Sequence, residues 1–207
     1  MSNPTPRFRV VNPRGRASLV SAVRSALELS GCRIVGSGPP GRTPLPITFD
    51  TPGGERVHIL VYAVRAPLAD AGATTGQVPQ PPAEPPAAIR CDEHASPAML
   101  LLAVDLERRV FIGADPLLHE TTACVAERRI AARHCDRVLA GGWHAWEHDR
   151  DDEEDPVEIL VGFTGANFLR YVCFARDAFA EEAGHRHALA ERPWSRAAES
   201  FAPSASR

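Results

Sequence analysis

Histidines and carboxylates are the side chains of this sequence that could do acid–base or metal chemistry, so their spacing is the first indication of function. His185 and His187, with His134 and Cys135, could supply metal ligands. Their spacing differs from that of zinc motifs, in which paired ligands are separated by about two to five residues. The acidic run 149–155 lacks the central glycine and closing glutamate of a calcium loop. We therefore predict no metal site and no bound cofactor.

A second set of carboxylates could belong to a nuclease. Asp50, Asp92 and Glu93 can be drawn together as a metal site of that kind. The lysine that many nucleases place beside such carboxylates is missing, so a degenerate metal-dependent nuclease stays an alternative and no catalytic residue is assigned. His58, inside a predicted strand, and His119, just after another, are expected to pack or hydrogen-bond within the fold.

The basic side chains exclude several reaction classes. All 23 of them are arginine, and the chain of 207 residues holds no lysine. No P-loop lysine can therefore reach a phosphate, and no amine can form a Schiff base with a carbonyl substrate. Arginine stays protonated and offers a planar fork of hydrogen-bond donors. These residues are suited to binding anions rather than to exchanging protons, and an enzymatic role is less expected than a binding role.

The distribution of charge indicates where an anion would dock. Residues 1–49 hold seven arginines and one acid, Glu28, whereas residues 147–158 hold eight acids and one arginine. Such polarity steers an anionic partner to one end of a molecule. We predict a flexible basic arm over residues 1–15 that follows DNA, as basic arms do elsewhere. The candidate nucleic-acid-binding residues are Arg7, Arg9, Arg14, Arg16, Arg65 and Arg90.

Composition favours a cytoplasmic protein. The net charge is −3, 44% of the residues are hydrophobic, and no stretch approaches the length of a membrane span. Five cysteines stand far apart, which favours free thiols over a disulfide framework.

Hydrophobic periodicity predicts an α+β domain over residues 16–182. Helices are expected from residue 16 to 30, from 127 to 140 and from 167 to 182. Strands are expected in the order that follows: 45–50, 55–65, 99–104, 110–114, 121–126, 143–147 and 157–163. The proline-rich stretch 66–88 is predicted to be an inserted loop, and residues 183–207 a weakly ordered tail. The fold class is therefore a mostly antiparallel mixed sheet with about three helices packed on it, in a single domain.

Three segments in order resemble the N-terminal, non-catalytic domain of bacterial HNH restriction endonucleases. The first segment is the strand 57–65 followed by Arg90-Cys-Asp92-Glu93. The second segment is 99–119, which ends in an aspartate and a histidine. The third segment is 158–172, a strand that begins with a glutamate and leads into a helix with a tyrosine. The chain departs from the family after Glu93, where His94-Ala-Ser replaces a polar strand, and it carries no HNH module.

The resemblance implies a DNA-recognition component of a restriction or anti-phage defence system that acts with a separate nuclease. Its partners would be duplex DNA, including base-modified DNA, and another subunit of that system. Arg90, Asp92 and Glu93 are the family-matching residues, with a salt bridge that closes the long loop as their structural alternative. The main alternative function is a protein–protein module or homo-oligomeric scaffold, in which the acidic loop and the basic arm meet on neighbouring subunits.

Overall fold

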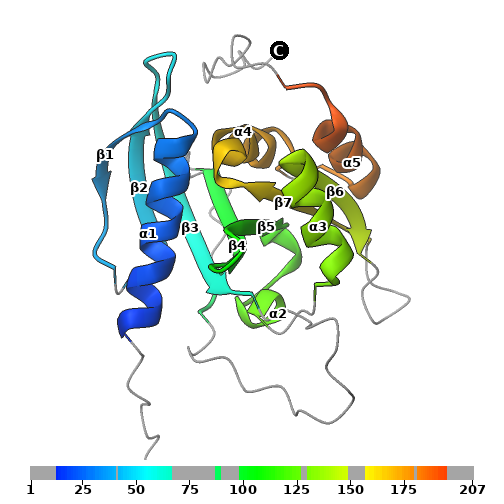
Figure 1. Cartoon of the computed structure of the whole chain (residues 1–207), viewed down its shortest axis with the longest axis horizontal. Coiled ribbons are helices and arrows are strands. Elements are labelled where there is room, and N and C mark those ends of the chain that lie inside the picture. The colour runs from blue at the N-terminus through cyan, green and yellow to red at the C-terminus, as the bar shows by residue number, and fades with distance from the viewer. Residues whose placement is uncertain are drawn as a thin grey trace, which may run out of the picture.

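A seven-stranded mixed sheet forms the centre of the molecule, with helices on both of its faces (Figure 1). The computed structural model describes residues 13–40, 42–66, 87–89, 98–126, 130–148, 157–179 and 181–194. The strand order across the sheet is β1-β2-β3-β4-β5-β7-β6. The strands are β1 (Arg33–Ser37), β2 (Leu45–Asp50), β3 (Arg56–Arg65), β4 (Ala98–Asp105), β5 (Val110–Ala114), β6 (Trp143–His148) and β7 (Glu158–Thr164).

Five α-helices and two short 3-10 turns complete the described part of the chain. They are α1 (Pro13–Leu29), η1 (Pro116–Leu118), α2 (Ala123–Ala126), α3 (Ala132–Gly141), η2 (Gly165–Asn167), α4 (Phe168–Asp177) and α5 (Ala183–Glu191). None of the described helices combines the length and the apolar character that crossing a membrane requires.

The sheet separates two apolar cores, because successive side chains of a strand point to opposite faces. One core packs α1, α4 and α5 against the face that carries Phe49, Val61 and Phe163. The other packs α2 and α3 against the face that carries Tyr62, Leu101 and Ile112. The layers are therefore helix, sheet and helix. The sheet twists along its width, as sheets do, and α1 and α3 stand at its two ends (Figure 1).

The central strands β3 and β4 pair in parallel, with Ile59 beside Ala98 and Arg65 beside Val104. All the other strand pairs run antiparallel, as the sequence predicts. Parallel neighbours require a crossover connection, so the chain between β3 and β4 must return from the end of one to the start of the other. The proline-rich stretch belongs to this connection. Its described residues 87–89 pair with the segment before α2 through the bridge between Ala88 and Thr121.

Three local predictions need correction. Residues 121–126 form the short helix α2 rather than a strand, because Thr121 only bridges to Ala88 and the chain then turns into a helix. The sequence predicted no strand between the first helix and residue 45, where the structure has the edge strand β1. This strand is short, bulged and largely exposed, so no apolar alternation marks it. Helix α1 begins at Pro13, inside the predicted arm.

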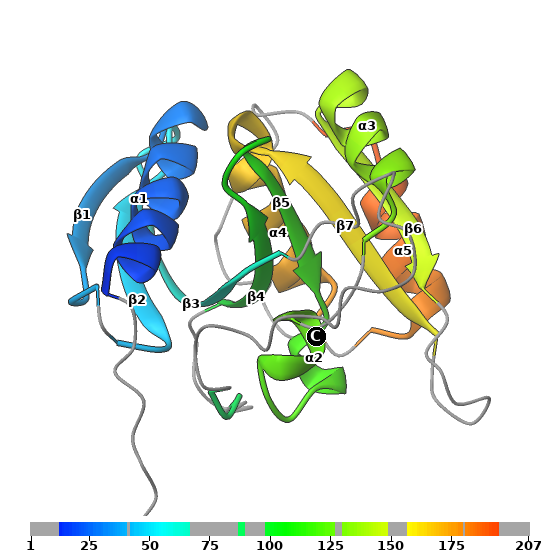
Figure 2. The same ribbon diagram turned by 60° about the horizontal axis from the view of Figure 1, so that its bottom comes forward.

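The C-terminal part of the domain is ordered further than the sequence indicates. Residues 183–191 form α5, so the prediction of a weakly ordered tail is wrong for them; residues 195–207 lie outside the described part. The indole N–H of Trp143 donates to the Ala190 carbonyl at 2.8 Å, and Arg170 donates to the same oxygen at 3.2 Å. These contacts fix the end of α5 against β6 and α4 (Figure 2).

Candidate nucleic-acid interface

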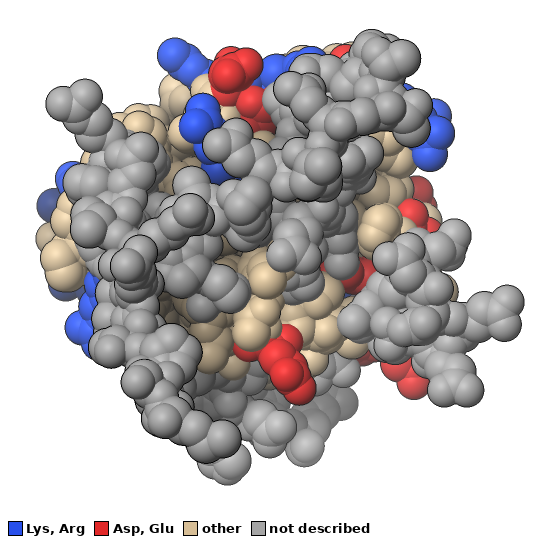
Figure 3. Space-filling view, turned by 90° about the horizontal axis from the view of Figure 1, so that it is seen from below, with Lys and Arg blue, Asp and Glu red and all other residues tan. Residues whose placement is uncertain are grey.

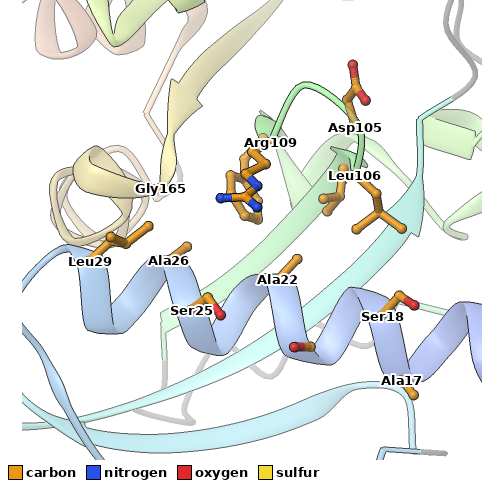
Figure 4. Close-up of a pocket in the computed structure, with 13 residues that line it drawn as sticks. Ala17, Ser18, Ala22, Ser25, Ala26, Leu29, Asp105, Leu106, Arg109 and Gly165 are labelled. Atoms are coloured by element: carbon orange, nitrogen blue, oxygen red, sulfur yellow. The ribbon is translucent and has the colours of Figure 1, made fainter.

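A groove of about 640 Å³ runs between α1 and the turn that joins β4 to β5 (Figure 4). The wall that α1 contributes consists of small and hydroxylated side chains and, at its end, Leu29; the opposite wall is apolar except for Arg109 and Asp105. The lining residues are Ala17, Ser18, Ser21, Ala22, Ser25, Ala26, Leu29, Val104, Asp105, Leu106, Arg109, Phe111 and Gly165. This volume lies within the range of about 300–1,000 Å³ that is usual for ligand sites.

At the end of α1, the helix and η2 approach each other closely. A Cβ atom on Gly165 would lie 3.3 Å from the Cα of Ala26, so only glycine fits without displacement. The buried Ser30 hydroxyl donates to the Gly165 carbonyl at 2.9 Å and accepts from the Leu169 amide at 3.2 Å. This end of α1 is thus fixed to η2 and α4, and the groove continues toward the beginning of the helix.

Arg109 is the charged side chain that projects into the groove toward α1 (Figure 4). Its backbone has φ of 55°, a left-handed conformation that residues with a Cβ seldom adopt. The side chain is exposed, and none of the described residues forms an ion pair or hydrogen bond with it. A permanently charged guanidinium without a protein partner in a groove is suited to an anionic ligand.

The buried Asp105 carboxylate holds the turn that presents Arg109. Its Oδ1 accepts from the amides of Glu107 and Arg108 at 2.9 and 3.0 Å, and the Arg108 guanidinium lies 3.6 Å from Oδ2. The carboxylate points away from α1 (Figure 4). Val104 faces α1, and the next residue of β4, Asp105, points to the opposite face of the sheet. Asp105 therefore faces the α3 layer, and the Arg108 side chain that pairs with it lies on that side too. The turn thus separates its two arginines and leaves Arg109 alone on the α1 side.

Other arginines gather at the same end of the sheet. Arg65 is the last residue of β3, beside Val104, and the strand alternation places it on the α1 face. Arg42 lines a small cavity between α1, β2 and β3. Both side chains are exposed. Helix α1 runs antiparallel to β3 and β4 and begins at this end (Figure 1). Seen from below, the molecule shows arginine side chains at its left, upper and upper right margins (Figure 3). Acidic side chains stand beside the arginines at the upper margin, and others lie nearer the centre and at the right.

The predicted arm residues are only partly described. Helix α1 includes Arg14 and Arg16 in its first turn, which puts their backbone at the arginine end, while their side chains lie outside the described part. Residues 1–12, with Arg7 and Arg9, are likewise outside it.

Arginines of the first fifty residues do not form one surface, contrary to the docking surface that the sequence suggests. Arg24 lies exposed on α1, whereas Arg33 belongs to β1 and faces the opposite side of the sheet. There Arg33 and Arg56 both hydrogen-bond to Asp50, the latter at 2.9 Å from Nε to Oδ1. The hydrogen bond from Arg56 is the main cause that lowers the pKa of Asp50. This pair of arginines is therefore already occupied by an internal acid.

The family-matching residues Arg90, Asp92 and Glu93 lie outside the described part, and so does any site that they would form. The described residue just before them, Ile89, donates its amide to the carbonyl of Glu120 at 2.8 Å. Ile89 therefore lies beside the segment that carries His119.

Four other residues of that resemblance meet in the core. His119 Nε2 lies 2.9 Å from Glu158 Oε1, which also accepts from the Asp115 amide at 3.0 Å. The Asp115 carboxylate in turn pairs with Arg186 of α5 at 3.1 Å. Tyr171 is fully buried nearby, and burial raises the pKa of its hydroxyl well above the usual value.

This cluster is closed to solvent and bonded to itself, which is typical of a structural ion network rather than a site open to substrate. The expectation that His119 and His58 are hydrogen-bonded is confirmed, since His58 Nδ1 also lies 2.9 Å from Thr48 Oγ1. Arg186 was missed because a single arginine in an alanine-rich helix gives no sign of burial.

The glycines between residues 36 and 41 form no ligand site in the described structure. Gly36, Gly38 and Gly41 have the spacing of a dinucleotide-binding loop, but Gly36 lies within β1 and the next described element is the strand β2 rather than a helix. Gly38 is required for packing, because a Cβ there would lie 2.7 Å from Pro46 Cδ. Within the described ranges no group of three or more potential metal ligands occurs.

Comparison with known proteins finds no matching family model, no matching curated protein and no matching solved structure. The function must therefore be inferred from the geometry of this chain.

Proposed function

We propose that the protein binds duplex DNA through the arginine end, defined by Arg42, Arg65, Arg109 and the first turn of α1 with Arg14 and Arg16. The observation that carries this proposal is the Arg109 guanidinium, which projects into a groove and has no partner among the described residues. Arginine forks bind phosphate oxygens bidentately. Neutralising phosphates supplies most of the non-specific affinity of proteins for DNA.

The groove provides more than charge. The serines 18, 21 and 25 stand along the α1 wall, where hydroxyl groups can hydrogen-bond to phosphate or sugar oxygens. Residues 1–12 precede α1 at this end, so Arg7 and Arg9 would extend the contact along the backbone or into a groove of the DNA. Together with its resemblance to a recognition domain, this supports a role as the DNA-binding component of a restriction or defence system that acts with a separate nuclease.

Fluorescence anisotropy with a labelled duplex tests the proposal. We expect binding at about 50 mM salt that weakens steeply as salt rises. Replacing one phosphate-contacting arginine should lower the affinity and reduce the salt slope by about one. Arg109→Gln and Arg65→Gln are the informative variants. Arg176→Gln is a matched control, because Arg176 belongs to α4 and pairs with its neighbour Asp177 at 2.8 Å.

The outcomes separate clearly. Absence of binding at low salt, or an Arg109→Gln variant that binds like the Arg176→Gln control, would overturn the proposal. Comparing plain with base-modified duplexes shows whether a modification is recognised.

A second candidate function is protein docking in the same groove. Leu29 is 64% exposed, and the half-buried Leu106 also contributes apolar surface to the groove. A partner seated there would bury these side chains, and its affinity would depend little on salt. Light scattering coupled to size exclusion, with and without DNA, distinguishes a scaffold subunit from a DNA-binding protein.

A further inference from the structure

Two imidazole rings and one indole form a cluster between α3 and β6, on the face of the sheet opposite the groove. His134 comes from α3, and His144 and Trp146 point to it from alternate positions of β6. The His134 ring stacks on the Trp146 ring with centroids 4.4 Å apart and planes within 17°. Its Nδ1 lies 3.1 Å from Nε2 of His144. All three side chains are half-buried.

The contacts of His134 favour one arrangement of the ring protons. Arg133 Nε donates to His134 Nε2 at 3.4 Å, so this nitrogen is the acceptor of the ring. In a neutral imidazole the other nitrogen then carries the proton. In the state in which both rings are neutral, His134 Nδ1 then donates to His144 Nε2. A pair that gains one proton keeps a donor and an acceptor at this contact. The bond is lost when both rings are protonated, because each of the two facing nitrogens then carries a proton.

A metal ion does not fit between these nitrogens. Metal–imidazole bonds are about 2.0–2.1 Å long and lie along the ring-plane lone pairs. Two nitrogens that face each other at 3.1 Å cannot both direct a lone pair to one ion without turning. The two facing nitrogens are therefore arranged for a hydrogen bond rather than for a metal ion.

The surroundings oppose a positive charge on the pair. Partial burial is the largest cause that lowers the pKa of His134, to about 4, followed by the charges of His144, Arg133, Arg137 and His148. Burial and Arg137 also lower the pKa of His144. The Trp146 ring face acts in the other direction, since a cation over an indole is stabilised by roughly 0.5–2 kcal/mol. On this face β5 and β7 contribute apolar side chains to α3, among them Ile112 and Leu160.

We propose that the His134–His144 pair is an acid-sensitive latch, which fixes α3 to β6 while one of the two facing nitrogens can accept a hydrogen bond and releases α3 when both rings are protonated. Release would expose Cys135 and Val138, the two residues of α3 that are buried against the sheet. The proposal is independent of DNA binding, since the groove lies on the other face.

Hydrogen exchange of the full chain, corrected for the intrinsic rate at each pH, tests the latch. We expect the amide protection of α3 to fall by about tenfold or more between pH 7 and pH 4, while β2 and β3 keep theirs. The double variant His134→Gln/His144→Gln can keep a neutral hydrogen bond but cannot titrate, so its α3 protection should not depend on pH. His58→Gln is the control, because His58 lies on β3 and bonds to Thr48.

Constant α3 protection down to pH 4, or an equal acid response in the double variant, would overturn the proposal. Should the double variant fold poorly, NMR titration of the unaltered chain decides. The latch requires the two rings to titrate below the usual histidine range and as a coupled pair. Two independent rings with ordinary pKa values would contradict it.

Discussion

The guanidinium of Arg186 lies 3.1 Å from the carboxylate of Asp115, with both side chains about 6% exposed. Arg186 also donates to the carbonyl of Ala178, at the end of α4. A helix near the C-terminal end of the chain is thereby fixed to the end of β5. The pair acts as a buried connection between elements that are far apart in sequence.

Removing one partner of this ion pair should be costly. Arg186→Met leaves the Asp115 carboxylate buried and unpaired, and such a loss typically costs about 3–5 kcal/mol. Asp115→Asn keeps the acceptor oxygen that caps η1, where Oδ1 binds the Leu117 amide at 3.0 Å. Denaturant unfolding of both single variants and the double variant gives the coupling energy. We expect the double variant to be less destabilised than the sum of the singles; strict additivity would show that the two charges do not interact.

Gly113 should not tolerate a methyl group. A Cβ there would lie 2.0 Å from the ring of Tyr171, which is fully buried over β5. Overpacking of this kind typically costs about 1–3 kcal/mol. Gly113→Ala should therefore lower the free energy of unfolding, and Tyr171→Leu should relieve the added clash in a double-mutant cycle. Gly184→Ala in α5 is the control, because nothing lies within 4 Å of its Cβ position. A Gly113→Ala variant as stable as this control would contradict the packing.

Arg109 should show opposite effects on stability and binding. Its left-handed backbone costs about 1 kcal/mol that glycine would not incur. Arg109→Gly is therefore expected to raise the free energy of unfolding while it weakens DNA binding. Thermal unfolding and anisotropy on the same sample measure both. If the variant is neither more stable nor weaker in binding, the left-handed backbone at Arg109 does not destabilise the fold and its side chain does not contribute to DNA binding.

Stability should depend on pH through His134. Its pKa in the folded state is lowered to about 4 from the usual 6.5, so the unfolded chain takes up the proton first as pH falls. The contribution is complete above pH 6.5 and is lost progressively down to about pH 4. Denaturant midpoints measured across this window should decline with falling pH, and less so in His134→Gln. An identical decline in that variant would assign the effect to other groups.

Local patterns predicted most of the fold. The hairpin of β4 and β5 around Asp105 follows from two apolar runs and a polar turn, and α1 follows from leucine and valine spaced four apart. What the sequence could not indicate depends on distant contacts. The parallel pairing of β3 with β4 joins residues separated by a long proline-rich stretch, and the burial of Arg186 depends on Asp115, some seventy positions away.

The candidate site shows the same division. Charge counting pointed to the N-terminal region, and α1 does begin at the arginine end. It could not reveal that Arg33 is paired with Asp50, nor that Arg109, much later in the chain, projects beside α1. Arg109 occupies the last position of a short hairpin turn, where glycine is usual. This feature can be recognised only once the turn geometry is known.

The parallel pairing of β3 with β4, which we call the seam, divides the sheet into two sections. Each section is formed by one continuous part of the chain. Residues up to 66 supply α1 and three strands, and residues from 98 supply the other four, with seven facing register pairs between the sections. A polypeptide severed anywhere in the connection would still contain every strand, but closing the seam would become a bimolecular event. The connection thus sets an effective local concentration for the two sections, and its length influences assembly only logarithmically.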